Sequence, residues 1–240
     1  PPQLAVADKR VDVCCNIDST SCTISRGVVP RVRAVQSYSI RAAILSRTMV
    51  VDGTPTDCVI LAVNEVMKCA PDLCLSGINQ GSNMGEDVLY SGTVAGAMEA
   101  AVIGIPAIAI SYAGDDHKEI DRWKDCLTEL LRSILDHESF PTATLFNINL
   151  PPVDPDNVKG VRVTSLGQRR YSDTITKALD PSGREYFWIG GGKVSWSGAA
   201  DSDFEAIQGG YVSVTPLHLD LTNYRLLEEI RGWRMTLKAT

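Results

Sequence analysis

Two short apolar segments flank a loop of small polar residues, and this order constrains the fold more than any other feature of the sequence. LCLSG at 73–77 and PAIAISY at 106–112 are typical of buried strands. Between them, TVAGAMEAAVIG at 93–104 has the small residues of a helix that packs closely on a sheet. Strand, helix and strand in succession indicate parallel strands joined by right-handed crossovers. The sequence therefore predicts an α/β fold with a mostly parallel sheet flanked by helices.

A helix start just upstream is the clearest local signal. TMVVDG at 48–53 indicates a short strand that ends at a glycine. Thr54 is then a natural N-cap, Pro55 suits the first turn, and Asp57 completes a capping box. The helix is expected to continue to residue 68.

The rest of the chain is expected to complete one domain over residues 1–230. Further elements follow at 116–136 (an amphipathic helix), 144–151 and 158–167 (strands), 165–200 (an extended arm with a hairpin), 209–224 (a strand and a loop) and 224–236 (a C-terminal helix). Residues 1–47 are atypical, because they carry a formal charge of +4, contain no Glu and show no sustained period.

Composition excludes some classes of function. The net charge of −6 argues against binding to a nucleic-acid polymer. The chain has no apolar run of about 18 residues, so we expect no membrane span, and its first residues do not resemble a signal peptide. Its seven cysteines form no C-x-x-C pair, and Cys58 and Cys74 have apolar neighbours typical of buried thiols. A cytoplasmic location is the expectation.

The polar loop can be interpreted as a flexible linker or as a site for an anion or a metal. Residues 75–94 hold four glycines, three serines and two asparagines but no Lys or Arg. Ser91, Gly92 and Thr93 open the next helix, where free N–H groups and the helix dipole attract anions. Asn79, expected just past the strand end, offers a hard amide oxygen suited to Mg²⁺, Mn²⁺ or Ca²⁺. An anion site beside a hard-oxygen ligand is typical of phosphate-ester chemistry.

Each of these residues also has a structural interpretation. Asn79 alone is a common turn residue, and Ser91 and Thr93 alone are common helix caps. Glu86 and Asp87 are expected to be solvated loop or first-turn charges. Neither a G-K-[ST] loop nor G-x-G-x-x-G is present, which disfavours a nucleotide-cofactor enzyme. The residues alone support a phosphate-binding α/β enzyme.

Several long motifs resemble the SurE family of nucleotidases. They are GTPTDCV at 53–59, PDLCLSGINQGSNMGEDVLYSGTVAGAMEA at 71–100, IPAIAIS at 105–111, FNINLP at 146–151, VKGVRVTSLGQRRY at 158–171, DPSGREYFWIG at 180–190 and DFEAIQGGYVSVTPLHLDLTNY at 203–224. The resemblance covers about residues 48–230.

This resemblance implies a Rossmann-like core, a C-terminal arm that joins subunits into a homodimer or homotetramer, and metal-dependent hydrolysis of nucleoside 5′- and 3′-monophosphates. It implies Mg²⁺ or Mn²⁺ as the cofactor. By the same resemblance, Asn79 is a metal ligand, Ser91, Gly92 and Thr93 hold the phosphate, and Asn79, Ser91 and Thr93 form the catalytic set.

The chain departs from the family at its N-terminus. The family's N-D-D-G motif, which supplies two metal-binding carboxylates, is absent, and Asn16-Ile17-Asp18 is the nearest string. Gln36-Ser37 lies too close to Gly53 to match the family's Q-S-G. Residues 1–47 are therefore hypothesised to be out-of-frame or divergent. The alternative function is a catalytically impaired SurE-like protein that binds nucleotide or phosphate without turnover.

Overall fold

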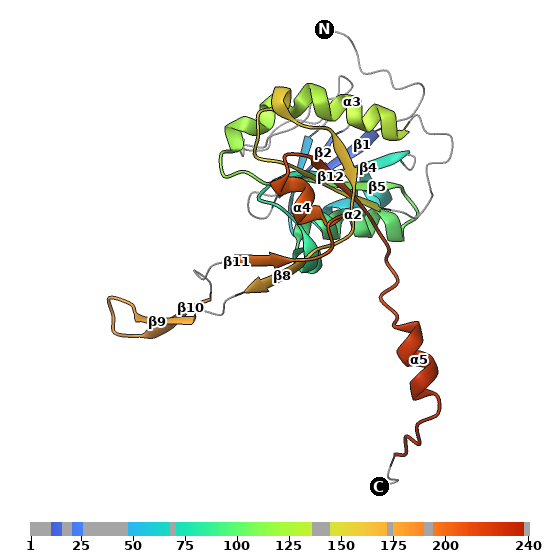
Figure 1. Ribbon diagram of the computed structural model, residues 1–240. Helices are drawn as coiled ribbons and strands as arrows, with labels where there is room; N and C mark the ends of the chain where they lie inside the picture. The colour runs from blue at the N-terminus through green and yellow to red at the C-terminus, as the bar shows by residue number, and fades with distance from the viewer. Residues whose placement is uncertain are drawn as a thin grey trace.

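A single eight-stranded sheet forms the centre of the protein (Figure 1). The computed structural model describes residues 11–15, 21–25, 48–67, 71–135, 145–171, 175–189 and 194–237. The strands lie in the order β3 (Thr48–Asp52), β2 (Ser21–Ser25), β1 (Val11–Cys15), β4 (Leu73–Gln80), β5 (Ala107–Tyr112), β6 (Leu145–Leu150), β12 (Val212–Leu217) and β7 (Val161–Val163).

The expected mostly parallel sheet is confirmed in its centre. β1, β4, β5 and β6 run parallel to one another, and β7 runs parallel to β12. β12 is antiparallel to β6, and β2 and β3 add an antiparallel edge beyond β1. The described strands of the N-terminal segment therefore cover the edge of β4.

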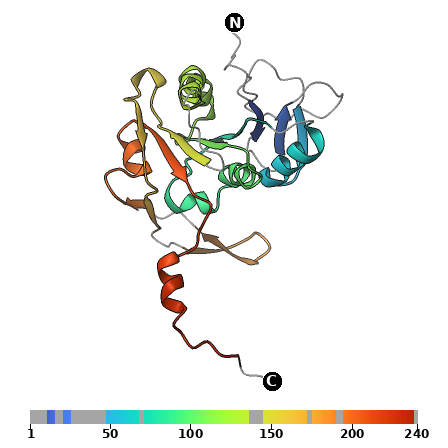
Figure 2. The ribbon, with the colours of Figure 1, turned by 90° about the vertical axis from the view of Figure 1, so that its right-hand side faces the viewer.

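Helices cover both faces of the sheet (Figure 2). α1 (Pro55–Leu61), its continuation η1 (Ala62–Val66) and α2 (Gly92–Val102) pack on one face, and η3 (His117–Trp123) with α3 (Lys124–Leu135) packs on the other. β5 explains the division, because Ala107 and Ala109 contact the first cluster while Ile108 and Ile110 contact the second.

The small residues of α2 allow the helix to approach the sheet closely. A Cβ at Gly96 would lie 3.1 Å from Ser76 Oγ of β4 and 3.3 Å from Pro55 Cβ of α1. The buried thiols expected at Cys58 and Cys74 are confirmed, since both side chains are fully buried and unbridged in the core under this helix.

An arm and a C-terminal tail leave the body of the protein (Figure 1). β8 (Gln168–Tyr171) pairs with β11 (Val194–Ser197) at the base of the arm, and β9 (Ile175–Leu179) pairs with β10 (Glu185–Ile189) further out. α4 (Asp203–Gln208) returns the chain to the sheet, and α5 (Tyr224–Ile230) buries none of its residues. The terminal helix ends at 230, six residues before the expected boundary.

Two short 3₁₀ helices complete the described elements: η2 (Gly85–Leu89) and η4 (Pro155–Asn157). Within the residues that the structure describes, no helix has the length and apolar character that a membrane span requires.

The capping box at α1 is confirmed. The Thr54 hydroxyl accepts a hydrogen bond from the Asp57 amide at 3.2 Å, and the Thr54 amide donates to the Asp57 carboxylate at 2.7 Å. The α-helix is shorter than expected, because its last turns adopt the wider π geometry of η1.

Replacing the cap tests its contribution to stability. We expect Thr54→Ala to lower the free energy of unfolding by about 1 kcal/mol, because the Asp57 amide loses its acceptor and the Asp57 carboxylate loses the hydroxyl donor. Urea unfolding followed by circular dichroism measures this change. Thr56→Ala, inside the same helix, is the matched control, and an equal loss in both variants would contradict the capping role.

Candidate functional site

Asn79 lies inside β4 rather than just past its end, so the expected strand boundary at residue 77 is wrong. The register between β4 and β5 shifts between Ser76 and Asn79. Pairing then resumes with Asn79 opposite Ser111 of β5, and the strand continues to Gln80. Gly77 allows this path, since it has a φ of +133° and a Cβ there would lie 2.3 Å from the Ile110 carbonyl oxygen.

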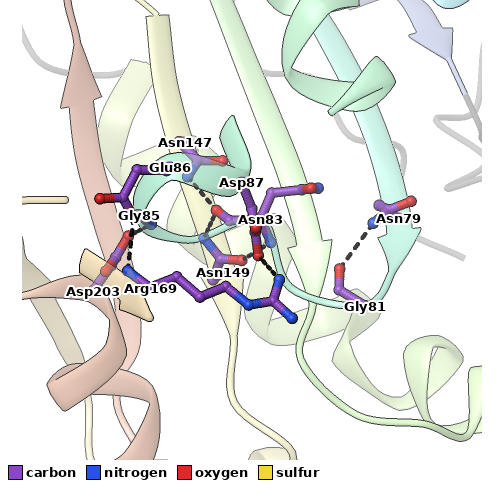
Figure 3. Close-up of polar contacts among 10 residues, drawn as sticks. All are labelled: Asn79, Gly81, Asn83, Gly85, Glu86, Asp87, Asn147, Asn149, Arg169 and Asp203. Carbon is purple, nitrogen blue, oxygen red and sulfur yellow. Dashed lines mark hydrogen bonds and ion pairs between the residues drawn. The ribbon is translucent and has the colours of Figure 1, made fainter. Parts of the chain in front are cut away.

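The side chain of Asn79 closes the turn that follows the strand (Figure 3). Its Nδ2 donates to the carbonyl oxygen of Gly81 at 2.8 Å. This bond fixes the orientation of the amide and leaves Oδ1 as an acceptor at the carboxyl end of β4. The structure thus gives Asn79 a turn role, and its amide oxygen stays available for a ligand.

The first turn of α2 has the geometry of an anion site. Ser91 is the N-cap, and its hydroxyl accepts from the Val94 amide at 3.1 Å. The N–H groups of Gly92 and Thr93 belong to the turn in which no intrahelical carbonyl is available as a partner. Ser91 and Gly92 are partly exposed, so a phosphate oxygen can reach this turn.

Two buried hydroxyls lie where α2 meets β4. Ser76 Oγ and Thr93 Oγ1 are inaccessible to solvent and have no hydrogen-bond partner in the part of the chain that the structure describes. Gly96, one turn after Thr93 and on the same side of α2, packs against Ser76. A buried unpaired hydroxyl destabilises a fold by about 1–3 kcal/mol, so both groups are chemically suited to a polar ligand.

Asn83 fixes the loop between β4 and α2 (Figure 3). Its amide N–H donates to Asn149 Oδ1 at 2.9 Å, and its carbonyl oxygen accepts from Asn147 Nδ2 at 2.7 Å and Asn149 Nδ2 at 3.0 Å. Its own Nδ2 donates to Ser111 Oγ at 2.7 Å. β5 and β6 therefore hold this residue through both its backbone and its side chain.

Asp203 holds the next part of the loop. Its carboxyl oxygens accept hydrogen bonds at 2.8–2.9 Å from the amides of Gly85, Gly167 and Phe204. The residue is fully buried. Burial raises the pKa of this carboxyl, and the hydrogen bonds from the three amides offset part of that rise. Asp203 thus joins the loop, the base of the arm and α4.

An ion pair adds a second tie between the loop and the arm. The Glu86 carboxylate accepts from the Arg169 amide at 2.7 Å, and this bond lowers the pKa of Glu86. The Arg169 guanidinium pairs with the Asp87 carboxylate and lies over the Trp196 ring, 5.4 Å from its centroid. Glu86 and Asp87 lie in the first turn of η2, so the prediction of first-turn charges is confirmed. The alternative interpretation of Asp87 as a solvated charge is wrong, because Asp87 is mostly buried in its pair with Arg169.

The side chains that the structure describes do not fit a divalent metal ion by themselves. Among them, no group of three or more His, Cys, Asp or Glu side chains could hold an ion. Asn79, Ser76 and Thr93 supply hard oxygen atoms but no negative charge, which Mg²⁺ requires in most protein sites. Cys15, the last residue of β1, pairs in register with Ser76, while Asp18 and Gln36-Ser37 lie outside the described residues.

Sequence reasoning found the ends of the loop and missed what holds it. Asn147 and Asn149 are fully buried polar residues in an apolar strand, and Asp203 is a buried acid at a helix start. Asn147 and Asn149 break the otherwise apolar run of FNINLP, while Asp203 opens DFEAIQ, which also holds Glu205 and Gln208. This break was the available signal, because buried polar residues are normally hydrogen-bonded.

Replacing Asp203 tests the tie between loop and arm. We expect Asp203→Asn to lower the free energy of unfolding by about 2 kcal/mol. The side-chain NH₂ of the asparagine, which is a donor, would replace a carboxyl oxygen that accepts from a backbone N–H. Chemical denaturation measures the change. The exposed Asp201 offers a matched control, and if Asp201→Asn destabilises the protein as much, burial of the Asp203 carboxyl is not the cause.

Comparisons with known proteins agree with this architecture. The family model "Survival protein SurE" matches residues 7–173. A protein named 5′-nucleotidase SurE from Gemmatimonas aurantiaca is 54% identical over 187 residues, 76% of this chain and 74% of that protein. One of the same name from Aquifex aeolicus is 42% identical over 183 residues, covering 76% of this chain and 72% of that protein.

The fold agrees as well. A crystal structure of the SurE protein from Aquifex aeolicus superposes with a TM-score of 0.68 at 41% identity, covering 78% of this chain and 75% of that one. The family match starts at residue 7, inside the segment that lacks the N-D-D-G motif. The family model, the relatives and the superposed fold all point to the same family. The chain belongs to the SurE survival-protein family.

Proposed function

We propose that the protein is a metal-dependent phosphomonoesterase that hydrolyses nucleoside 5′- and 3′-monophosphates. Relatives that are 54% and 42% identical over most of their length carry the name 5′-nucleotidase. The observation that carries the proposal is the start of α2. There a serine-capped turn, whose first amides have no intrahelical acceptor, follows a loop that buried hydrogen bonds hold in place. Phosphate esters suit such a turn.

In this proposal the chain binds and orients the phosphoryl group. The amides of Gly92 and Thr93 donate to its non-bridging oxygens, and the Ser91 hydroxyl, which already accepts from Val94, can donate its own proton. These donors stabilise the charge that develops on the phosphoryl oxygens during hydrolysis. Because Asn83 and Asp203 fix the loop, the donors need little reorganisation when the substrate binds.

The metal part of the proposal depends on residues outside the described ranges. Asn79 provides one hard oxygen for Mg²⁺ or Mn²⁺, and the described side chains include no group of three or more His, Cys, Asp or Glu that could complete a site. Asp18 comes three residues after the end of β1, whose last residue pairs with Ser76. We therefore propose Asp18 as the first carboxylate to test.

A second candidate function is nucleotide or phosphate binding without turnover. The absence of N-D-D-G from the sequence and of an acidic cluster among the described side chains favours it. The anion site at α2 does not require a metal, so binding can survive the loss of hydrolysis. Turnover separates the two candidates.

Self-association is the proposed role of the arm and the tail. Both expose large apolar side chains: Ile175, Leu179 and Phe187 in the arm, and Leu221, Tyr224, Trp233 and Met235 in the tail. Exposed apolar groups of this size favour protein contacts. We propose a homodimer or homotetramer joined by these segments.

A reducing compartment fits the cysteines. Cys58, Cys74 and Cys126 are not in disulfides, and the first two are fully buried. Burial also raises the pKa of the Cys126 thiol, which lowers its reactivity. We propose a cytoplasmic location on this basis.

Phosphate release from 5′-AMP and 3′-AMP tests hydrolysis. We expect release with Mn²⁺ or Mg²⁺, its loss on chelation, and at least about a hundredfold lower rate for Asn79→Ala and Asp18→Asn, since each removes a proposed ligand. Asn64→Ala on the exposed surface of η1 is the control for Asn79. Nucleotide binding by the folded wild type without phosphate release would reject the enzyme and support the second candidate.

Thr93 offers a separate test of the phosphate site. We expect Thr93→Val to lower kcat/KM at least about tenfold without loss of stability, because its buried hydroxyl has no partner to lose among the described residues. Thr164→Val is the opposite control. Its hydroxyl bonds to Ser213 and Thr215, so that variant should lose stability and keep activity. Full activity in Thr93→Val would remove this hydroxyl from the proposed site.

A further inference from the structure

Arg169 connects the arm to the segment that precedes the phosphate site. It lies in β8 at the base of the arm, far along the chain from η2. Both ends of the residue contact η2: its amide donates to Glu86, and its guanidinium pairs with Asp87 (Figure 3). Arg169 thus joins β8 to η2, and its partners Glu86 and Asp87 lie 83 and 82 positions before it in the chain.

The surroundings of Arg169 make this contact rigid. Its side chain is 24% exposed and that of Asp87 is 16% exposed, so the pair is partly shielded from water. The Trp196 ring lies under the guanidinium and stacks on Phe204, with ring centroids 5.0 Å apart and planes at 13°. Phe204 follows Asp203, which holds Gly85 at the start of η2. Stacking and a planar guanidinium restrict the geometry more than a lysine would.

The contact acts on the residues that open α2. η2 ends at Leu89, and only Tyr90 separates it from the N-cap Ser91. The Tyr90 amide donates to the Asp87 carbonyl oxygen at 3.1 Å, so the residue that pairs with Arg169 also sets the path into the cap. A shift of Asp87 would therefore move the Gly92 and Thr93 amides, which are the proposed donors to phosphate.

We propose that Arg169 is a positioning residue for the phosphate site, which fixes the start of α2 through Asp87 and Glu86 and so makes that site dependent on the arm. The proposal rests on the proposed function for its kinetic test. Arg169 acts through the loop and does not bind the phosphate itself, because its guanidinium is held by Asp87 and Trp196. Contacts made by the arm can therefore change phosphate affinity.

Four variants of the full-length chain test the proposal: Arg169→Met, Asp87→Asn, the double variant, and Arg184→Met as the control. Arg184 pairs with Asp180 in the turn between β9 and β10, so it is an ion pair of the same arm that does not contact the loop. KM and kcat for 5′-AMP and the inhibition constant of inorganic phosphate are the kinetic readouts. Light scattering checks that all variants keep the same oligomeric state.

We expect Arg169→Met to raise KM and the phosphate inhibition constant about five- to tenfold and to lower kcat as well, because the displaced amides also stabilise the transition state. Asp87→Asn should have the same effect. The double variant should be no worse than either single variant, because both substitutions break the same Arg169–Asp87 ion pair. Arg184→Met should match the wild type. If Arg169 instead bound phosphate directly, Asp87→Asn would free it and leave phosphate affinity unchanged or stronger.

Hydrogen exchange at the amides of residues 85–95 provides a readout that needs no activity. Exchange there should be faster in Arg169→Met and Asp87→Asn than in Arg184→Met, while exchange in β4 and β5 stays the same. A wild type without turnover would reject the proposed function but leave this test intact. Unchanged exchange at 85–95, or independent and additive kinetic losses, would overturn the proposal. If Arg169→Met does not fold, Asp87→Asn, which keeps the arginine, decides it.

Discussion

The buried carboxyl of Asp203 is the constraint on which the candidate site depends. A buried acid is unfavourable unless its oxygens are hydrogen-bonded, and this one has the amides of three segments as donors. Gly85 and Gly167 are small enough for the backbones to meet there, since a Cβ on Gly85 would lie 2.6 Å from the Gly167 carbonyl oxygen. Another arrangement of the loop would deprive Oδ2 of the Gly85 amide that donates to it.

Buried contacts of the backbone and of polar side chains also explain why small polar residues are frequent at 75–94. A flexible linker would not need to bury Asn83, whose amide, carbonyl and side chain all bond to β5 and β6. Nor would it need a glycine at position 77, where the backbone of β5 is so close that a Cβ would collide with the carbonyl oxygen of Ile110. The loop is thus a fixed structure whose end forms the start of α2, and this supports the interpretation as a site over that as a linker.

Local signals in the sequence predicted the local structure, while the contacts that shape the site are not local. Thr54, Pro55 and Asp57 predicted the start of α1 because the two partners of the capping box are only three positions apart. The sequence predicted that β4 ends before Asn79, which is wrong. The strand continues past the register shift after Ser76 because it pairs with β5, and this pairing is not visible in the local sequence. The bond from Gly85 to Asp203 joins residues 118 positions apart, and no local pattern marks the two as partners.

The position of a bound anion would decide whether the start of α2 is the phosphate site. A crystal structure of the full-length chain with 5′-AMP, or with tungstate located by its anomalous scattering, would give that position. We expect the anion to lie within hydrogen-bond distance of the Gly92 and Thr93 amides, with the Asp203 bonds to Gly85 and Gly167 unchanged. An anion bound instead at the guanidinium of Arg169, or an α2 start that binds none at saturating concentration, would contradict this expectation.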